Sequence, residues 1–532
     1  MNTPRKILVC LQFVVLLLLV GGIASATAGG PKPENKVPKK VEGTAKRLED
    51  RLQKQGYQVA RGYFKLYTQD DCPYSYEVLH SCLGNNPAAP YVLPVVPAWP
   101  DEWVDRGTAG IIGPTAKGYN ASYRLDPREA IVILGELPPP ARYFGLQTYL
   151  LSRPGKWHEE SAQYNFVKTS LPTLLNTFFT VLPKNHERLE LFADLSGSIN
   201  NVVIANQSHD VWGQVRYFVI TPDQAMDSTV RQALGRLGVP DNYVFTEQIP
   251  SQLGDTAMAI GLDEESDDFL TVLRYAMPDD GGGDGARSTA WRERLPMVVL
   301  RIRDTRPSHQ SQPYPWTAFE SRSRTAPPET ALASNLAMLA MAVCNRWEQP
   351  CQPLDLKPLL NMRASQLSLT GPACVQVGMN CLAPTEDSAY FMSSRLPLPD
   401  HRVYAVIGAL GTQTGNATYV GLGLNVSTTQ LGFDNIEDYN LAGTANRYTA
   451  VPNHERFFLQ YFARDCTDLE DLTAGSNCYS IGDQLPNCYD PTDPTCAMLV
   501  LSVRNYLFPS SQRGPAPEFT LNPLFIPLQR PQ

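Results

Sequence analysis

The chain has 532 residues, of which 43% are hydrophobic and 18% are charged, a composition that excludes an intrinsically disordered protein and predicts at least two domains. The net charge of −8, with no basic stripe interleaved with aromatic residues, excludes a nucleic-acid-binding protein. The 45 prolines favour short strands and loops over long helices.

The N-terminus has the three parts of a secretory signal peptide. MNTPRK is basic, the apolar run ILVCLQFVVLLLLV follows, and GGIASATA supplies small residues. This run is shorter than the roughly 20 residues that a membrane-spanning helix needs, so an uncleaved anchor is the less favoured alternative. We therefore predict a signal peptide over residues 1–28, cleaved near Ala26 or Ala28, no later transmembrane segment, and a secreted or periplasmic protein.

Residues 29–305 are predicted to contain a linker followed by a β-rich domain. Residues 29–57 combine a Pro/Lys-rich linker with one charged helix, VEGTAKRLEDRLQK. Residues 58–305 then contain strand-like segments separated by proline-rich turns, among them YQVARGYFKLY, PYVLPVVPAW, EAIVILGEL and ARYFGLQTYLL. This spacing predicts a β-sandwich-like (jelly-roll) core.

Two helices are expected inside this domain. VRYFVIT, a helix and NYVFTEQIP form a predicted β-α-β insertion, in which Thr221 is the N-cap, Pro222 the first helical residue and Gln224 the partner in a capping box. A second helix is predicted from Ser266 to Met277, because a serine and two aspartates at its start suit a helix N-terminus. MVVLRIR at residues 297–303 is predicted to be a buried strand.

Residues 306–329 are polar and rich in proline, and we interpret them as a linker between domains. Residues 330–532 are predicted to form a second, disulfide-rich domain that contains strands. It would begin with a buried helix, TALASNLAMLAMAVCNRW, and include a hairpin in which RVYAVIGAL and ATYVGLGLNV flank the turn GTQTGN. The predicted fold class is therefore α+β.

Eleven cysteines occur, and all except Cys10 fall into pairs that are close in sequence. In an exported chain an even number of cysteines indicates disulfides, and none of the spacings fits a zinc site. Pairing of sequential neighbours is the simplest arrangement, although the sequence does not fix the connectivity. The predicted disulfide cysteines are Cys72, Cys82, Cys344, Cys351, Cys374, Cys381, Cys466, Cys478, Cys488 and Cys496.

The tetrapeptide NHER occurs at residues 185–188 and again at residues 453–456. Alternating apolar residues follow both copies, and related strands begin at ARYF, VRYF and ERFF, of which the first two lack the His-Glu pair. We interpret the repeat as two related strand entries, with coincidence and a functional site as the alternatives. The weak catalytic candidates are His186, Glu187, His454 and Glu455.

Two loops are candidate binding sites. PDDGGGDGARSTAW places Asp279, Asp280 and Asp284 in one glycine-rich turn, where carboxylates and carbonyl groups could bind calcium, the single cofactor that the sequence suggests. The alternative is a solvated loop. PAWPDEWVDRG places Trp99 and Trp103 in a proline-bounded loop, where the rings could contact a ligand, and packing in the core is the alternative.

No sequence motif of a nucleophilic, metal-dependent or nucleotide-dependent enzyme is present. We therefore expect an exported soluble protein that binds an extracellular or periplasmic ligand of the glycan type, and the sequence leaves open whether it is an enzyme. One alternative is an exported hydrolase that uses carboxylates, and another is a structural component of an envelope or matrix.

Overall fold

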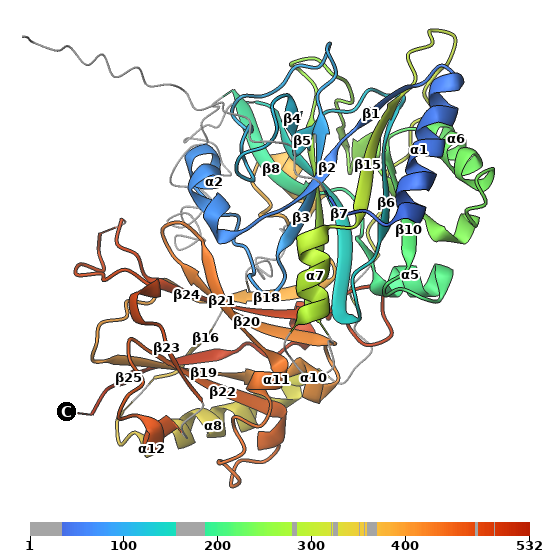
Figure 1. The fold of residues 1–532 in the computed structure, drawn as a ribbon. Coiled ribbons are helices and arrows are strands. Elements are labelled where there is room, and N and C mark those ends of the chain that lie inside the picture. The colour runs from blue at the N-terminus through green and yellow to red at the C-terminus, as the bar shows by residue number, and fades with distance from the viewer. Residues whose placement is uncertain are drawn as a thin grey trace, which may run out of the picture.

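The computed structural model describes residues 35–155, 187–278, 285–320, 322, 328–350, 352–355, 357–358, 370–473, 477–493 and 495–531 (Figure 1). The predicted signal peptide lies outside these residues. Within them, no helix combines the length and the apolar character that crossing a membrane requires. The fold is mixed α+β and antiparallel sheets dominate it, which confirms the coarse fold class.

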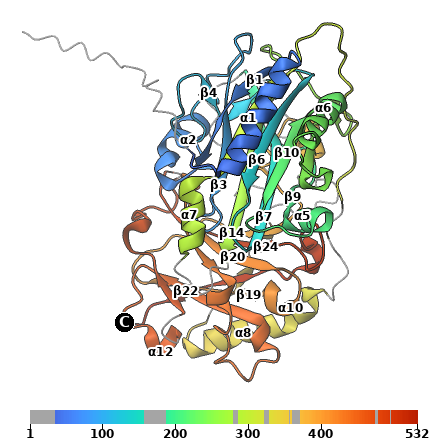
Figure 2. The same cartoon turned by 45° about the vertical axis from the view of Figure 1, so that its right-hand side comes forward.

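The first large sheet has five strands in the order β1-β15-β6-β10-β11. Helices α1 (Lys39–Lys54) and α6 (Gln224–Gly235) pack on one face through a shared apolar cluster (Figure 2). The central strand β6 is buried on both faces, because Val132 faces the helices whereas Ile131 and Ile133 face the next sheet. The strands are β1 (Gln58–Arg61), β6 (Glu129–Glu136), β10 (Val215–Thr221), β11 (Val244–Gln248) and β15 (Met297–Arg303).

The β-α-β segment has the predicted connectivity. Strands β10 and β11 pair in parallel, and α6 lies between them in sequence. The helix boundary differs from the prediction, because the N-cap is Asp223, whose side chain accepts a hydrogen bond from the backbone N–H of Ala225 at 3.2 Å. The hydroxyl of Thr221 instead donates to the backbone oxygen of Glu129 on the neighbouring strand, at 2.6 Å.

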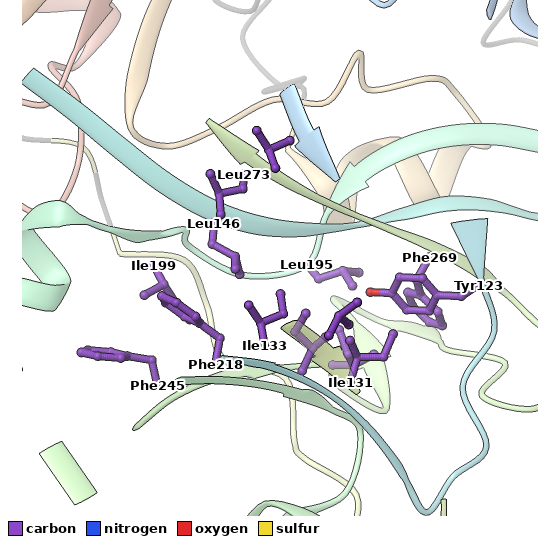
Figure 3. Packing of buried hydrophobic residues seen from close by; sticks show 14 of the residues in the cluster. Tyr123, Ile131, Ile133, Leu146, Leu195, Ile199, Phe218, Phe245, Phe269 and Leu273 are labelled. Atoms are coloured by element: carbon purple, nitrogen blue, oxygen red, sulfur yellow. The ribbon is translucent and has the colours of Figure 1, made fainter. Parts of the chain in front are cut away.

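The second sheet contains eight strands, of which five form the path β2-β3-β14-β7-β8. Its core with the first sheet is the largest apolar cluster, and in Figure 3 Ile133 of β6 and Phe218 of β10 point toward Leu146 of β7. The strands are β2 (Tyr63–Leu66), β3 (Tyr91–Pro97), β4 (Tyr119–Asn120), β5 (Ser122–Tyr123), β7 (Ala141–Pro154), β8 (Arg188–Asp194), β9 (Ile199–Asn200) and β14 (Asp268–Pro278).

The predicted helix from Ser266 to Met277 is wrong, because these residues contribute the central strand β14. Alternate residues of β14 enter different cores, so the strand is apolar on both faces and its sequence shows no polar stripe. The aspartates at its start do not cap a helix. Asp268 forms ion pairs with Arg124 and Arg188, and Asp267 forms one with Arg153.

Residues 354–529 contribute two further sheets of five strands each, in the orders β16-β25-β19-β22-β23 and β17-β18-β24-β20-β21. One apolar cluster fills the space between the two sheets, and helix α8 (Ala333–Arg346) covers the outer face of the first. The strands are β16 (Leu354–Asp355), β17 (Lys357–Pro358), β18 (Ser388–Met392), β19 (Arg402–Ala409), β20 (Tyr419–Val426), β21 (Gly432–Glu437), β22 (Phe457–Ala463), β23 (Cys478–Ser480), β24 (Leu499–Tyr506) and β25 (Leu524–Gln529).

The predicted hairpin is wrong. Strand β19 pairs with β22 and β25, whereas β20 pairs with β21 and β24 in the facing sheet. The connection between them is the short helix α10, so the chain crosses from one layer to the other. The remaining elements are α2 (Cys72–Leu79), α5 (Asn201–Ser208), α7 (Ala286–Arg294), α9 (Gly371–Val377), α10 (Gly411–Thr414), α11 (Asp438–Leu441), α12 (Glu470–Thr473), β12 (Gln252–Leu253) and β13 (Thr256–Ala257).

Disulfides join sequential neighbours, as the spacing suggested. Four bonds are described, Cys72–Cys82, Cys374–Cys381, Cys466–Cys478 and Cys488–Cys496. Cys344 is also disulfide-bonded, and Cys351 lies outside the described residues.

Candidate functional site

A cavity of about 200 Å³ lies between one face of the eight-stranded sheet and the sheet that contains β24. Strands β3, β7, β8 and β14 contribute one wall, and β18, β20 and β24 contribute the other. Three loops complete the lining, one after α2, one before β18 and one between β20 and β21. The cavity is therefore built from both parts of the chain.

Strand alternation decides which side chains reach the cavity. On β14, Leu270, Val272 and Arg274 line it, while their neighbours enter the core behind. On β24, even-numbered residues such as Ser502 and Arg504 line it, while odd-numbered residues such as those at 501 and 503 fill the core between the C-terminal sheets. In both walls, one face of the sheet packs in an apolar core and the opposite face lines the cavity.

Arg274 is a buried cation on the first wall. Its side chain is 6% exposed, and it lies over the rings of Tyr91 and Tyr149 at 5.3 and 5.6 Å. Its Nη1 donates to the hydroxyl oxygen of Tyr149 at 2.9 Å. Among the described residues, no carboxylate forms an ion pair with it.

Arg504 is a second buried cation, on the opposite wall. It is 8% exposed, and its Nη2 donates to the backbone oxygen of Gly84 at 3.3 Å. Its Nη1 is buried and has no hydrogen-bond partner in the described structure, and no carboxylate there pairs with the guanidinium. Gly423 makes room for this side chain, because a Cβ at that position would collide with Nη1.

Two tyrosines, Tyr390 and Tyr506, lie close to the two arginines. Tyr506 is close enough to both Arg274 and Arg504 that each lowers its pKa, although burial outweighs them and keeps the pKa well above its ordinary value. The hydroxyl groups of Tyr390 and Tyr506 lie 3.4 Å apart. The phenol of Tyr506 is therefore a neutral hydrogen-bonding group next to two positive charges.

Strand β8 brings Arg188 and Glu190 to the same cavity. Arg188 is neutralised, because its Nη2 lies 3.0 Å from a carboxylate oxygen of Asp268 and also donates to the backbone oxygen of Ser266. The side chain of Glu190 has no hydrogen bond or ion pair within the described part of the chain. Burial, with a smaller contribution from Asp105, raises the pKa of Glu190 to about 8.

Disulfides hold two of the loops that complete the cavity. Cys82 is bonded to Cys72 of α2 and precedes the lining residues Leu83 and Gly84. Cys381 is bonded to Cys374 of α9 and precedes a second lining segment, residues 382–384. The backbone N–H of Cys82 also donates to Thr429 of the C-terminal part at 2.7 Å.

Among the described residues of the two NHER segments, Arg188 alone lines the cavity. His186 lies outside the described residues, and Glu187 is exposed in the turn before β8. His454 and Glu455 lie in a short 3-10 helix before β22 and do not line the cavity. Both repeats precede strands, as predicted, but the residue of the first copy that faces the cavity is Arg188.

The tryptophan loop packs on arginines. Trp99 is buried, and the guanidinium of Arg301 lies 5.2 Å from its ring centre. Trp103 is half-buried under Arg124 at 4.4 Å, and Arg188 lies 5.7 Å from the same ring. Neither tryptophan lines the cavity, and their contact with a ligand stays a prediction.

The proposed calcium ligands Asp279, Asp280 and Asp284 lie outside the described residues. Within the part of the chain that is described, no group of three or more His, Cys, Asp or Glu side chains is placed to hold a metal ion. The calcium prediction is therefore untested.

Sequence reasoning missed Glu190, Arg274 and Arg504. Each is a charged residue next to an apolar neighbour within a strand, and that is the one signal that could have selected them. A charged side chain on a strand with two buried faces needs an ionic partner or a polar cavity. Neither can be identified without knowing which strands lie next to it in the fold.

No family model matches the sequence, and no curated protein matches it. Among solved structures, an uncharacterised protein from Burkholderia cenocepacia is 10% identical and aligns over 92% of this chain and 87% of its own, with a TM-score of 0.33. A protein from Vibrio parahaemolyticus is 9% identical and aligns over 86% of this chain and 99% of its own, also with a TM-score of 0.33. At these values the likeness carries no argument about function.

Proposed function

We propose that this chain is an exported binding protein whose ligand occupies the cavity between the eight-stranded sheet and the sheet of β24. The observation that supports it is the combination of an apolar lining with buried Arg274 and Arg504 on facing walls and the half-buried Glu190, none of which has an ionic partner among the described residues. Concave, largely apolar cavities with a few convergent polar groups are typical of ligand sites. A structural protein has no need for such a cavity.

Export to an oxidising compartment is part of this proposal. Four described disulfides support it, because such bonds persist outside the reducing cytosol. We also propose that residues 58–305 and 330–532 act as two domains with sandwich-like packing of their sheets, joined by residues 306–329. The described strands support this division, since those of residues 58–303 pair only with one another, as do those of residues 354–529.

The carboxylate-dependent hydrolase remains a second candidate because of Glu190. A carboxyl group with a pKa of about 8 is protonated at neutral pH and could act as a general acid. Hydrolysis of a glycosidic bond requires a second carboxylate in the same site. Asp105 is the nearest acid to influence Glu190, but it does not line the cavity. Binding is therefore the better-supported function.

The test is a screen for small molecules that raise the melting temperature of the oxidised protein, combined with a variant that fills the cavity. Met392 lines the cavity and is half-buried, so Met392→Trp should remove the stabilisation by any cavity ligand. Met338→Trp is the matched control, because Met338 is exposed on α8. If stabilising molecules act equally on both variants, or if none is found, the binding function is wrong.

A further inference from the structure

We propose that the ligand of this cavity is a small organic anion, whose anionic oxygen atoms bind Arg274 and Arg504 and whose apolar body lies along the sheet face formed by β3, β8 and β14. This inference rests on the proposed binding function and names the chemical class of the ligand. Three observations support it: two buried arginines lack an ionic partner in the described structure, the nearby hydrogen-bond donors suit anionic oxygens, and the cavity is small.

The first argument is that other buried arginines of this protein have either a carboxylate partner or several hydrogen-bond acceptors. Arg124 pairs with Asp268, and Arg301 pairs with Glu102 and Glu129. Arg216 has no described carboxylate partner, but its three nitrogen atoms donate to a serine hydroxyl group and to two backbone oxygens. Buried cations are costly unless they are paired in this way.

Arg274 and Arg504 do not follow this rule. Each is at least nine-tenths buried, each makes a single hydrogen bond, and no carboxylate in the described structure pairs with either. Both line the same cavity from opposite walls and both are close to Tyr506. An anion placed between the walls would supply the charge that is missing from both sides.

The second argument is that the donors suit anionic oxygens. Guanidinium groups bind carboxylate and phosphate groups through paired N–H donors, more strongly than neutral groups do. The hydroxyl groups of Tyr390 and Tyr506 lie near the same arginines and can donate as well. Carboxylate and phosphate groups share this chemistry.

The rest of the cavity suits a short apolar body. Leu93, Phe192, Leu270 and Val272 line the wall formed by the eight-stranded sheet. The volume of about 200 Å³ is below the roughly 300–1,000 Å³ of sites for drug-sized molecules, so the ligand is small. Glu190, which is protonated at neutral pH, would not repel an anion there.

The wild-type protein can be tested with a matched series of six-carbon compounds: hexanoate, hexyl phosphate, hexanamide and hexylamine, with inorganic phosphate alone as a further probe. Titration calorimetry on the oxidised chain should show that hexanoate or hexyl phosphate binds at least about 10-fold more tightly than hexanamide, because charge-assisted hydrogen bonds are stronger. The better of the two anions identifies a carboxylate or a phosphate ligand. Equal binding of hexanamide, or tighter binding of hexylamine, would overturn the anion class and leave the binding function intact.

Variants then test the two arginines. Arg274→Gln and Arg504→Gln should each weaken anion binding by roughly 10- to 100-fold while leaving hexanamide binding unchanged. Arg231→Gln is the control, because this arginine of α6 does not line the cavity. Parallel loss of hexanamide binding would show that the cavity itself has collapsed, and the wild-type series then decides the question. If no compound of either charge binds in a way that Met392→Trp abolishes, the binding function fails together with the ligand class.

Discussion

Glu190 shows how one side chain can make stability depend on pH. Its pKa is raised to about 8 in the folded protein by burial and by Asp105, whereas an unfolded glutamate has a pKa of about 4.3. Between these values the folded state holds a proton that the unfolded state has lost. The contribution of Glu190 to stability therefore falls as pH rises from about 4.3 to about 8 and is constant above that.

Glu190→Gln should remove this pH-dependent loss of stability, because glutamine does not titrate. We expect the variant and the wild type to have similar free energies of unfolding near pH 4, and the variant to be more stable by roughly 2 kcal/mol at pH 9, after discounting the shift for partial exposure. Urea unfolding across this pH range measures the difference. Glu265→Gln is the control, since Glu265 is exposed, and it should stay within about 0.5 kcal/mol of the wild type. A constant difference between Glu190→Gln and wild type would contradict the prediction.

At the residue scale, the sequence predicted cysteine chemistry better than it predicted the site. Cysteines that are close in sequence can pair through a short loop, and the four described disulfides follow this simplest pairing, which the spacing favoured without fixing it. The cavity joins Arg274 of β14 to Arg504 of β24, which lie in different sheets. No local sequence pattern shows that these two arginines line the same cavity. The aspartate loop and the tryptophan loop were selected by their composition, which does not show which residues meet in the folded protein.

At the scale of elements, the N-cap residue of α6 also binds a distant segment of the chain. One carboxylate oxygen of Asp223 accepts hydrogen bonds from the backbone N–H of Ala225 and of Gln312, at 3.2 and 2.7 Å. The same residue therefore caps the helix and fastens part of the segment that we interpret as a linker. Burial raises the pKa of Asp223 in spite of these bonds.

Asp223→Ala should lower the free energy of unfolding by about 1–2 kcal/mol, because a cap and a second buried hydrogen bond are lost. Asp241→Ala, at the far end of the same β-α-β unit, removes a carboxylate that is 80% exposed and should change it by less than about 0.5 kcal/mol. Denaturant unfolding of both variants checks this. A loss for Asp223→Ala no larger than for Asp241→Ala would show that Thr221 and Pro222 provide the helix start after all.

The type of an element, helix or strand, was easier to predict where one face is exposed to solvent than where both faces are buried. Helix α1 has charged and apolar faces, and its prediction is confirmed. Strand β14 has two buried faces and was mistaken for a helix, because an apolar run without a polar stripe has no visible period. Strands β19 and β20 were correctly predicted as strands, but the polar turn between them gave no sign that β20 joins another sheet.

At the scale of the molecule, Asp387 connects the two parts of the chain. It precedes β18, and it is fully buried against residues of the N-terminal part. Its carboxylate accepts hydrogen bonds from the hydroxyl group of Tyr143 at 2.8 Å, from Asn200 at 3.1 Å and from Ser198, and Arg513 lies 3.6 Å away.

Asp387→Ala should therefore lower the free energy of unfolding by about 3–5 kcal/mol, because Arg513 and several polar groups would lose their buried partner. Unfolding followed by fluorescence and by circular dichroism measures the loss and shows whether both parts still unfold together. Asp400→Ala is the control, since Asp400 is exposed, and it should stay within about 0.5 kcal/mol of wild type. A loss below about 1 kcal/mol for Asp387→Ala would mean that other contacts hold the two parts together.

The mixed α+β class was predictable from the sequence, because strand-like segments and a few capped helices were visible. The arrangement of the sheets was not, since register and sheet membership depend on contacts between distant residues such as Asp387 and Tyr143.

The two disulfide-held loops also tie the rim of the cavity to four buried cysteines. Cys72–Cys82 and Cys374–Cys381 each close a short ring next to a lining segment, and the sheets that form the main walls contain no part of either bond. Because the cysteines are buried, a reductant would reach these bonds only when the loops open. Reduction would then loosen the rim while the strands of the walls stay paired, so we expect it to weaken binding of the proposed ligand without unfolding the sheets.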